Sequence, residues 1–171
     1  MLKEKTKLAI LDLQKQYPEK RSAIIPALHL AQKEQGYLPQ ETQAEVAELF
    51  EISQNEVNSL VTFYDMFYEK PMGKHIIHAC KNLSCMLKGS DKMIQQLCQK
   101  LQINPNETTA DKEITVILSE CLAACDRAPM ILANDKVIGP VKDSDLDEII
   151  TSLKKTSGHV CSVPSFEVSH E

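Results

Sequence analysis

The sequence predicts an α+β protein in which an N-terminal helical bundle precedes an α/β domain with a four-stranded mixed sheet. Residues 1–70 carry apolar side chains at the three- and four-residue spacing of helices, whereas residues 71–156 alternate strand-like and helical segments. Residues 157–171 lose this periodicity and are expected to form a loose tail. Of the 171 residues, 43% are hydrophobic, so the chain can bury a core without covalent cross-links.

Four helices are expected in the first part of the chain. They cover residues 7–17, 22–36 and 40–50 and a segment that begins at residue 53. Gly36 is well placed to end the second helix, and Ser53 with Glu56 forms the capping-box pattern that starts the fourth. The apolar stripe of the first helix is expected to consist of Leu8, Ile10, Leu11 and Leu13.

The second part is expected to follow the order β-α-β-β-β-α. The strands are residues 74–79, 113–119, 130–133 and 136–139, and the helices are residues 90–102 and 144–155, capped by Ser90 and Ser144. Asn134 and Asp135 separate the last two strands and indicate a hairpin. A helix between the first two strands makes them parallel, so the order is compatible with a thioredoxin-like layer of four strands.

Composition excludes several classes of function. The net charge of -5 argues against nucleic acid as a partner, and no phosphate-binding glycine loop is present. The apolar runs are too short to span a bilayer, and the N-terminus lacks a signal-peptide core, so we expect a cytoplasmic protein without direct membrane insertion. No Ser-His-Asp, HExxH or paired-carboxylate arrangement stands out, so no independent catalytic site is expected.

Four of the six cysteines form two pairs, each directly after a predicted strand: Cys80 with Cys85, and Cys121 with Cys125. If the two strands are parallel neighbours, both loops leave the same edge of the sheet and the four thiols converge. Thiolates are soft ligands that suit zinc or iron-sulfur clusters. Structural zinc sites favour two-residue gaps, whereas these gaps hold four and three residues, which favours the two metal atoms of a [2Fe-2S] cluster.

Other arrangements of these cysteines stay open at this point. A single zinc ion or no metal at all is compatible with the spacing, while a thiol-disulfide oxidoreductase would need a C-x-x-C motif. A Rieske centre would need two histidines, and only His78 lies near a pair. Cys98 lies within a predicted helix and Cys161 within the tail, so neither is expected to be a ligand.

Three motifs carry a resemblance to a known family. They are Gln-x-x-x-Gly-Tyr-Leu-Pro at residues 32–39, Thr-Phe-Tyr-x-Met-Phe at residues 62–67, and C-x4-C with C-x3-C-x-x-Ala-Pro around the cysteine pairs. From about residue 18 to about residue 155, the chain resembles the thioredoxin-like [2Fe-2S] subunit of NADH:quinone oxidoreductase, respiratory complex I. In one departure, Ala123 stands where the family often has Gly, which costs about 1 kcal/mol if that position needs a positive φ.

The resemblance implies an electron-transfer subunit with one [2Fe-2S] cluster, bound by Cys80, Cys85, Cys121 and Cys125. It also implies partners: the FMN-containing, NADH-binding flavoprotein subunit and other peripheral-arm subunits of complex I. The helical residues 1–70 would dock the flavoprotein, and residues 71–156 would form the ferredoxin domain. Two alternatives remain: the equivalent subunit of an NAD-linked hydrogenase or formate dehydrogenase, and a zinc-stabilised interaction module.

Details around the expected site can also be predicted. The aromatic residues of "TFYDMFY" (62–68) are expected to pack in a core or an interface. Backbone N–H groups of residues 82–86 are expected to donate to the sulfurs, and Lys81, Lys88 and Arg127 flank the ligands. Ala128 precedes a proline and is expected to be extended.

Overall fold

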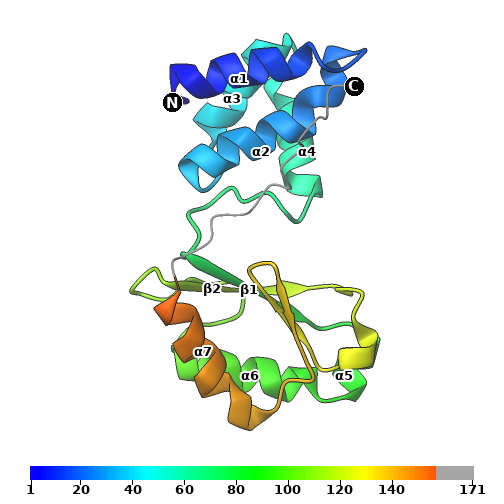
Figure 1. The fold of residues 1–171 in the computed structure, drawn as a ribbon, viewed down its shortest axis with the longest axis vertical. Coiled ribbons are helices and arrows are strands. Elements are labelled where there is room, and N and C mark those ends of the chain that lie inside the picture. The colour runs from blue at the N-terminus through cyan, green and yellow to red at the C-terminus, as the bar shows by residue number, and fades with distance from the viewer. Residues whose placement is uncertain (157–171) are drawn as a thin grey trace. The chain divides into compact units, whose positions relative to one another are not determined.

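A computed structural model describes residues 1–156 as two compact units, one formed by Met1–Pro71 and the other by the described part of Met72–Cys161. The first unit is helical, and the second contains the sheet (Figure 1). The expected tail at residues 157–171, including Cys161, lies outside the described residues.

The helical unit contains four α-helices and one short 3₁₀ helix. Their bounds are α1 Glu4–Gln14, η1 Lys20–Ala23, α2 Ile24–Gln35, α3 Gln40–Phe50 and α4 Gln54–Phe63. Gly36 ends α2 with a φ of 83°, a left-handed conformation that glycine adopts without strain. Ser53 and Glu56 form the expected capping box at the start of α4. The end of α2 and the start of α4 were therefore predicted correctly.

The predicted apolar stripe of α1 is wrong in part. Ile10 is fully buried, but Leu8 and Leu11 are 60% and 38% exposed. The other buried position of this helix is Gln14, whose Nε2 donates to the backbone oxygen of Leu49 at 2.9 Å. Leu13 is partly buried against the same core, so the unit covers the face that holds Ile10, Leu13 and Gln14 and leaves Leu8 and Leu11 outside it.

Two of the sequence motifs meet inside the helical unit. Gln32 is 1% exposed, and its Nε2 donates to the backbone oxygen of Met66 at 2.8 Å while its Oε1 accepts from the Tyr68 N–H at 2.8 Å. The Leu38 N–H donates to the Tyr68 oxygen at 2.6 Å. The buried carboxamide of Gln32 therefore supplies hydrogen-bond partners to two backbone groups of the segment after α4, where no regular helix or strand does so.

The second unit is built on a four-stranded sheet in the order β2-β1-β3-β4. The strands are β1 His75–Cys80, β2 Ile114–Ser119, β3 Ile131–Ala133 and β4 Lys136–Ile138. As predicted, β1 and β2 are parallel and β3 and β4 form an antiparallel pair. In addition, β3 pairs antiparallel with β1, which was not predicted. The helices α6 (Ser90–Leu101) and α7 (Leu146–Lys155) lie on the same face of the sheet, where their apolar side chains complete the core (Figure 1). The predicted α+β class with a mixed sheet is confirmed.

Three local features of this unit differ from the predictions. A short helix, α5 (Leu83–Leu87), lies between the first two cysteines and was not anticipated. Ser90 does not cap α6, because Gly89 occupies the cap position with a φ of 91° and the Ser90 hydroxyl is buried without a partner. Ser144 does not cap α7, because a 3₁₀ turn, η3 (Asp143–Asp145), precedes that helix and the Ser144 hydroxyl donates to Asp145.

Candidate metal centre

The two cysteine pairs lie at the carboxyl ends of two neighbouring parallel strands. Cys80 is the last residue of β1, and its partner across the ladder is Ser119, the last residue of β2. The Lys81 N–H then donates to the Ser119 oxygen at 3.0 Å, which continues the pairing beyond the strands. Because parallel strands end at the same edge of a sheet, the loop after β1 and the loop after β2 begin side by side.

The first pair is buried at the edge of the sheet. Cys80 and Cys85 are 3% and 2% exposed and pack with Met130. Cys85 reaches this position because the Asn82 side chain accepts from the Leu83 N–H at 2.8 Å and so starts α5. Burial raises the pKa of the Cys85 thiol, and a hydrogen bond with Cys80 raises it further. The Met130 N–H acts on this pKa in the opposite direction, because it donates to the sulfur.

The second pair is exposed to solvent and held in a tight loop. The Sγ atoms of Cys121 and Cys125 lie 3.7 Å apart. Between them Ala123 has a φ of 59°, in the left-handed region, and Cys125 begins the 3₁₀ helix η2 (Cys125–Arg127). The neighbouring Cys121 thiol raises the pKa of Cys125, whereas the Ser84 hydroxyl from α5 lowers it.

The spacing of the second pair fits two thiolates on one tetrahedral metal. Two sulfurs bound at about 2.3 Å with a tetrahedral angle lie about 3.8 Å apart. A [2Fe-2S] cluster takes four cysteine ligands, two on each iron, so two close pairs match its donor set. Within residues 1–156, no three Cys, His, Asp or Glu side chains form a group that could hold one metal ion. The structure therefore presents the four thiols as two separate pairs and does not gather three or four of them around one point.

Comparison with known proteins identifies the family. The sequence matches the thioredoxin-like [2Fe-2S] ferredoxin family over residues 10–154. The chain belongs to this family. It is 40% identical over 138 residues to the E 2 subunit of NADH-quinone oxidoreductase from Rhizobium meliloti (strain 1021), covering 81% of this chain and 82% of the relative. The E subunit of the same enzyme from Rickettsia bellii (strain RML369-C) is 38% identical over 146 residues, covering 84% of this chain and 87% of the relative. These matches confirm the resemblance found in the sequence.

A solved structure of an NAD+-reducing [NiFe]-hydrogenase in the H2-reduced state has a related fold. Its TM-score is 0.67 at 24% sequence identity, and the match covers 77% of this chain. This chain spans only 22% of that hydrogenase chain. At this level of identity the likeness concerns the fold.

Other residues near the pairs have polar partners or backbone conformations of their own. His78, within β1, has its Nδ1 atom 2.9 Å from the hydroxyl of Ser119, the last residue of β2. Lys81 Nζ forms an ion pair with Glu120 at 3.2 Å, and Arg127 Nε lies 3.7 Å from Asp126. Ala128 is extended, as predicted, and both the Ala128-Pro129 and Gly139-Pro140 peptide bonds are cis.

Sequence reasoning missed the groups that contact the sulfurs. The Met130 N–H donates to the Cys85 sulfur, and the Ser84 hydroxyl donates to the Cys125 sulfur. The expected N–H groups of Leu83 and Met86 donate to Asn82 instead. The pattern of Asn82 directly before an apolar run was an available signal for a helix start. No sequence signal indicated Met130, because its contact depends on β3 pairing beside β1.

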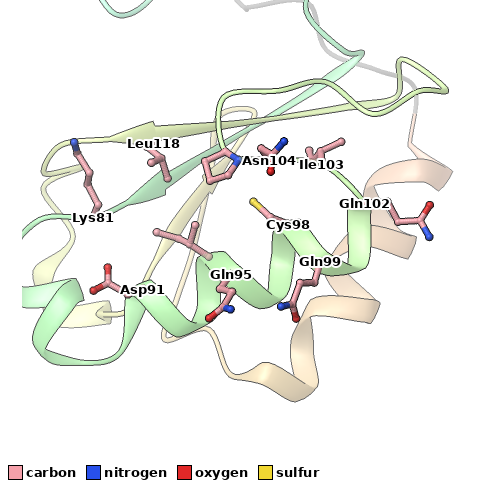
Figure 2. A pocket seen from close by; sticks show the side chains of 11 residues that line it. Lys81, Asp91, Gln95, Cys98, Gln99, Gln102, Ile103, Asn104 and Leu118 are labelled. Carbon is pink, nitrogen blue, oxygen red and sulfur yellow. The ribbon is translucent and has the colours of Figure 1, made fainter.

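A pocket of about 560 Å³ lies on the same unit, between α6 and the segment after it (Figure 2). Apolar residues such as Ile94, Ile103 and Leu118 line it together with the amide side chains of Gln95, Gln99, Gln102 and Asn104. Cys98 projects toward this pocket from α6 and is 5% exposed. Burial raises the pKa of the Cys98 thiol, and the nearby charge of Glu107 adds to the rise. Neither Cys80, Cys85, Cys121 nor Cys125 lines this pocket.

Proposed function

We propose that this chain is the electron-transfer subunit of an NADH:quinone oxidoreductase and that Cys80, Cys85, Cys121 and Cys125 bind its [2Fe-2S] cluster. A bound cluster of this kind supplies one-electron transfer. The observation that carries the proposal is the placement of two cysteine pairs at the ends of adjacent parallel strands, in a chain 40% identical to an E-type subunit of that enzyme. No substrate-processing group is needed within the chain, because a carrier only accepts electrons and passes them on.

The two cysteine pairs differ in their surroundings, which suits an electron carrier. Cys80 and Cys85 lie in an apolar environment with Met130, whereas Cys121 and Cys125 are exposed. The buried pair anchors the site to the sheet and excludes water from that side. The exposed pair leaves the opposite side of the site accessible to an electron-transfer partner. Solvent exposure and hydrogen bonds to the sulfurs are among the ways in which a protein sets the reduction potential of a cluster.

Exposed apolar side chains in each of the two units support a protein partner. On α5, Leu83, Met86 and Leu87 are 62%, 44% and 74% exposed. Within the helical unit, Phe63 is 76% exposed, although it continues an aromatic series whose other phenylalanine, Phe67, is buried. Such exposed apolar surface is typical of interaction sites. We assign it to the FMN-containing, NADH-binding flavoprotein subunit, with the helical unit of residues 1–70 as an additional docking element.

We place the chain in the cytoplasm, where it meets the membrane only through the assembled complex. Within residues 1–156, no helix is long and apolar enough to cross a membrane.

Purification from the native host tests the proposal. The tagged chain would be isolated without oxygen after gentle detergent extraction, and its companions identified by mass spectrometry. We expect a flavoprotein together with membrane-embedded quinone-reductase subunits. Recovery of the flavoprotein with a soluble hydrogenase or formate dehydrogenase would keep the cluster chemistry but assign the chain to a different enzyme. A colourless chain that contains zinc and gives no EPR signal after reduction would contradict the carrier function.

A further inference from the structure

A pair of side chains links the two cysteine loops directly. The Asn82 Nδ2 donates to Glu120 Oε2 at 3.0 Å, while Lys81 Nζ contacts Glu120 Oε1 at 3.2 Å. Asn82 lies between Cys80 and Cys85, and Glu120 immediately precedes Cys121. The carboxylate of one loop is therefore held through both of its oxygens by two neighbouring residues of the other loop.

Asn82 has further bonds that fix its own position. Its Oδ1 accepts from the Leu83 N–H at 2.8 Å, and its backbone oxygen accepts from the Met86 N–H at 2.9 Å. The same residue thus starts α5, which carries Cys85, and contacts the loop that carries Cys121. Because the Asn82 side chain is held by Leu83, its bond to Glu120 links the position of the second loop to the start of α5.

We infer that Asn82 and Glu120 form a latch that positions the two cysteine pairs relative to each other for cluster binding. This inference rests on the proposed function, because the latch acts on the cluster through the ligands. Neither residue is a ligand, so both are positioning residues. Groups of this kind commonly change metal affinity or activity by about 10- to 100-fold when altered.

The latch is expected to affect cluster retention much more than folding. Glu120 is exposed and Asn82 is half-buried, and the hydrogen bond between them is exposed to solvent, where a single such bond contributes little to stability. Ligand geometry is more demanding, because functional groups must be held within about 0.5 Å of the productive arrangement. The thiols of the second loop are exposed, so core packing does not fix them as it fixes Cys80 and Cys85, and the bond from Asn82 to Glu120 adds a restraint at that loop.

Exchange of donor and acceptor provides a specific test. Asn82→Asp keeps an oxygen that can accept from Leu83, because Asp and Asn are equally good at helix starts, but removes the donor and places a carboxylate against Glu120. In the double variant that combines Asn82→Asp with Glu120→Gln, the introduced amide can donate to the introduced carboxylate, so the link is restored with reversed polarity. Glu120→Ala is a second disrupting variant, at a side chain that is 68% exposed and tolerates truncation.

A matched control exists in the same unit. Asn104 Nδ2 donates to Glu107 Oε2 at 3.1 Å, and its backbone N–H also contacts that carboxylate at 2.9 Å. Asn104→Asp makes the same chemical change beside the same type of partner, away from the four cysteines. It separates an effect on the site from a general effect of the added charge.

The first readout is the rate at which the holo-chain loses its visible cluster absorption in excess iron chelator. We expect Asn82→Asp and Glu120→Ala to lose it about tenfold faster than the native chain. The double variant should return to within about twofold of native if the restored bond supplies the missing restraint. Asn104→Asp should behave as native, and the EPR line shape should change only in the disrupted variants. Equal rates for Asn82→Asp and Asn104→Asp, or a double variant as fast as Asn82→Asp, would overturn the latch.

The second readout needs no cluster and separates the two proposals. Hydrogen exchange of the apo-chain, followed by mass spectrometry, should speed up in residues 80–88 and 119–127 for Asn82→Asp and Glu120→Ala but not for Asn104→Asp. A native chain that takes up no iron and sulfide would contradict the proposed function. Unchanged exchange in both segments, in a chain that does hold its cluster, would contradict the latch alone.

Discussion

Gly139 lies directly against the backbone carbonyl oxygen of Arg127, so that a Cβ atom at this position would overlap that oxygen. The same Cβ would lie 2.9 Å from the Met130 Cβ. The contact joins the end of β4 to the segment that carries Cys125 and leads to Met130. It places a steric requirement for glycine beside the candidate metal centre.

Gly139→Ala should therefore destabilise the second unit by about 1–3 kcal/mol, because the overlapping atoms are backbone and cannot move independently. It should also speed cluster loss, since the Arg127 segment must shift. Gly36→Ala is the control: it has open space around it and a φ of 83°, so it adds only backbone strain in the helical unit. Chemical denaturation and cluster absorption would be measured for both. Similar cluster loss in both variants would argue against the steric explanation.

Ala123→Gly should stabilise the chain by up to about 1 kcal/mol, because Ala123 has a φ of 59° and an L-residue is strained there. The gain is limited by the greater freedom of glycine in the unfolded chain. Ala124 is the matched control, since its φ of -121° is not left-handed and glycine there should reduce stability. Denaturation midpoints of the two variants should move in opposite directions. A shift of both in the same direction would contradict the strain at Ala123.

Gln32→Leu should cost about 2–3 kcal/mol, because it leaves the Met66 oxygen and the Tyr68 N–H without their buried partner. Gln14→Leu removes one such bond, to the Leu49 oxygen, and should cost less. Urea denaturation followed by circular dichroism would compare the two. Equal losses would show that the Gln32 carboxamide does not bridge both groups in solution.

Asp111 should make stability depend on acid pH. Its pKa is lowered first by Lys154, whose Nζ lies 2.8 Å away, then by Thr109 and the Glu113 N–H. Since the folded pKa lies below the ordinary value of 3.8, this stabilisation is present above pH 3.8 and is lost as pH falls through the folded pKa. Asp111→Asn should lower stability at neutral pH and flatten the decline below about pH 4, as thermal melts would show. An unchanged acid slope in the variant would contradict this role.

Two helix ends and the parallel pairing of β1 with β2 were predictable because they depend on signals close together in the sequence. Gly36 and the capping box of Ser53 and Glu56 indicated two helix ends. The helical segment between β1 and β2 indicated that these strands are parallel. The exposure of Leu8 was not predictable in the same way, because which face of α1 is covered depends on the other helices. Helix α5 has only five residues, too few to show a helical period.

At the candidate site, spacing predicted the four cysteines and their position after two strands. Their assignment as ligands stays a prediction. The bond between Asn82 and Glu120 joins residues 38 positions apart, and the N–H of Met130 reaches Cys85 only through the pairing of β3 with β1. Contacts of this kind follow from the assembled sheet edge and not from any local pattern.

The central claim is tested most directly by EPR of the anaerobically purified chain after reduction with dithionite, together with iron and sulfide analysis. The account predicts two iron and two sulfide per chain and an EPR signal of a reduced [2Fe-2S] cluster. Serine at Cys80, Cys85, Cys121 or Cys125 should abolish or alter this signal, whereas Cys98→Ser should leave it unchanged. Zinc in place of iron, or an unaltered signal in Cys121→Ser, would contradict it.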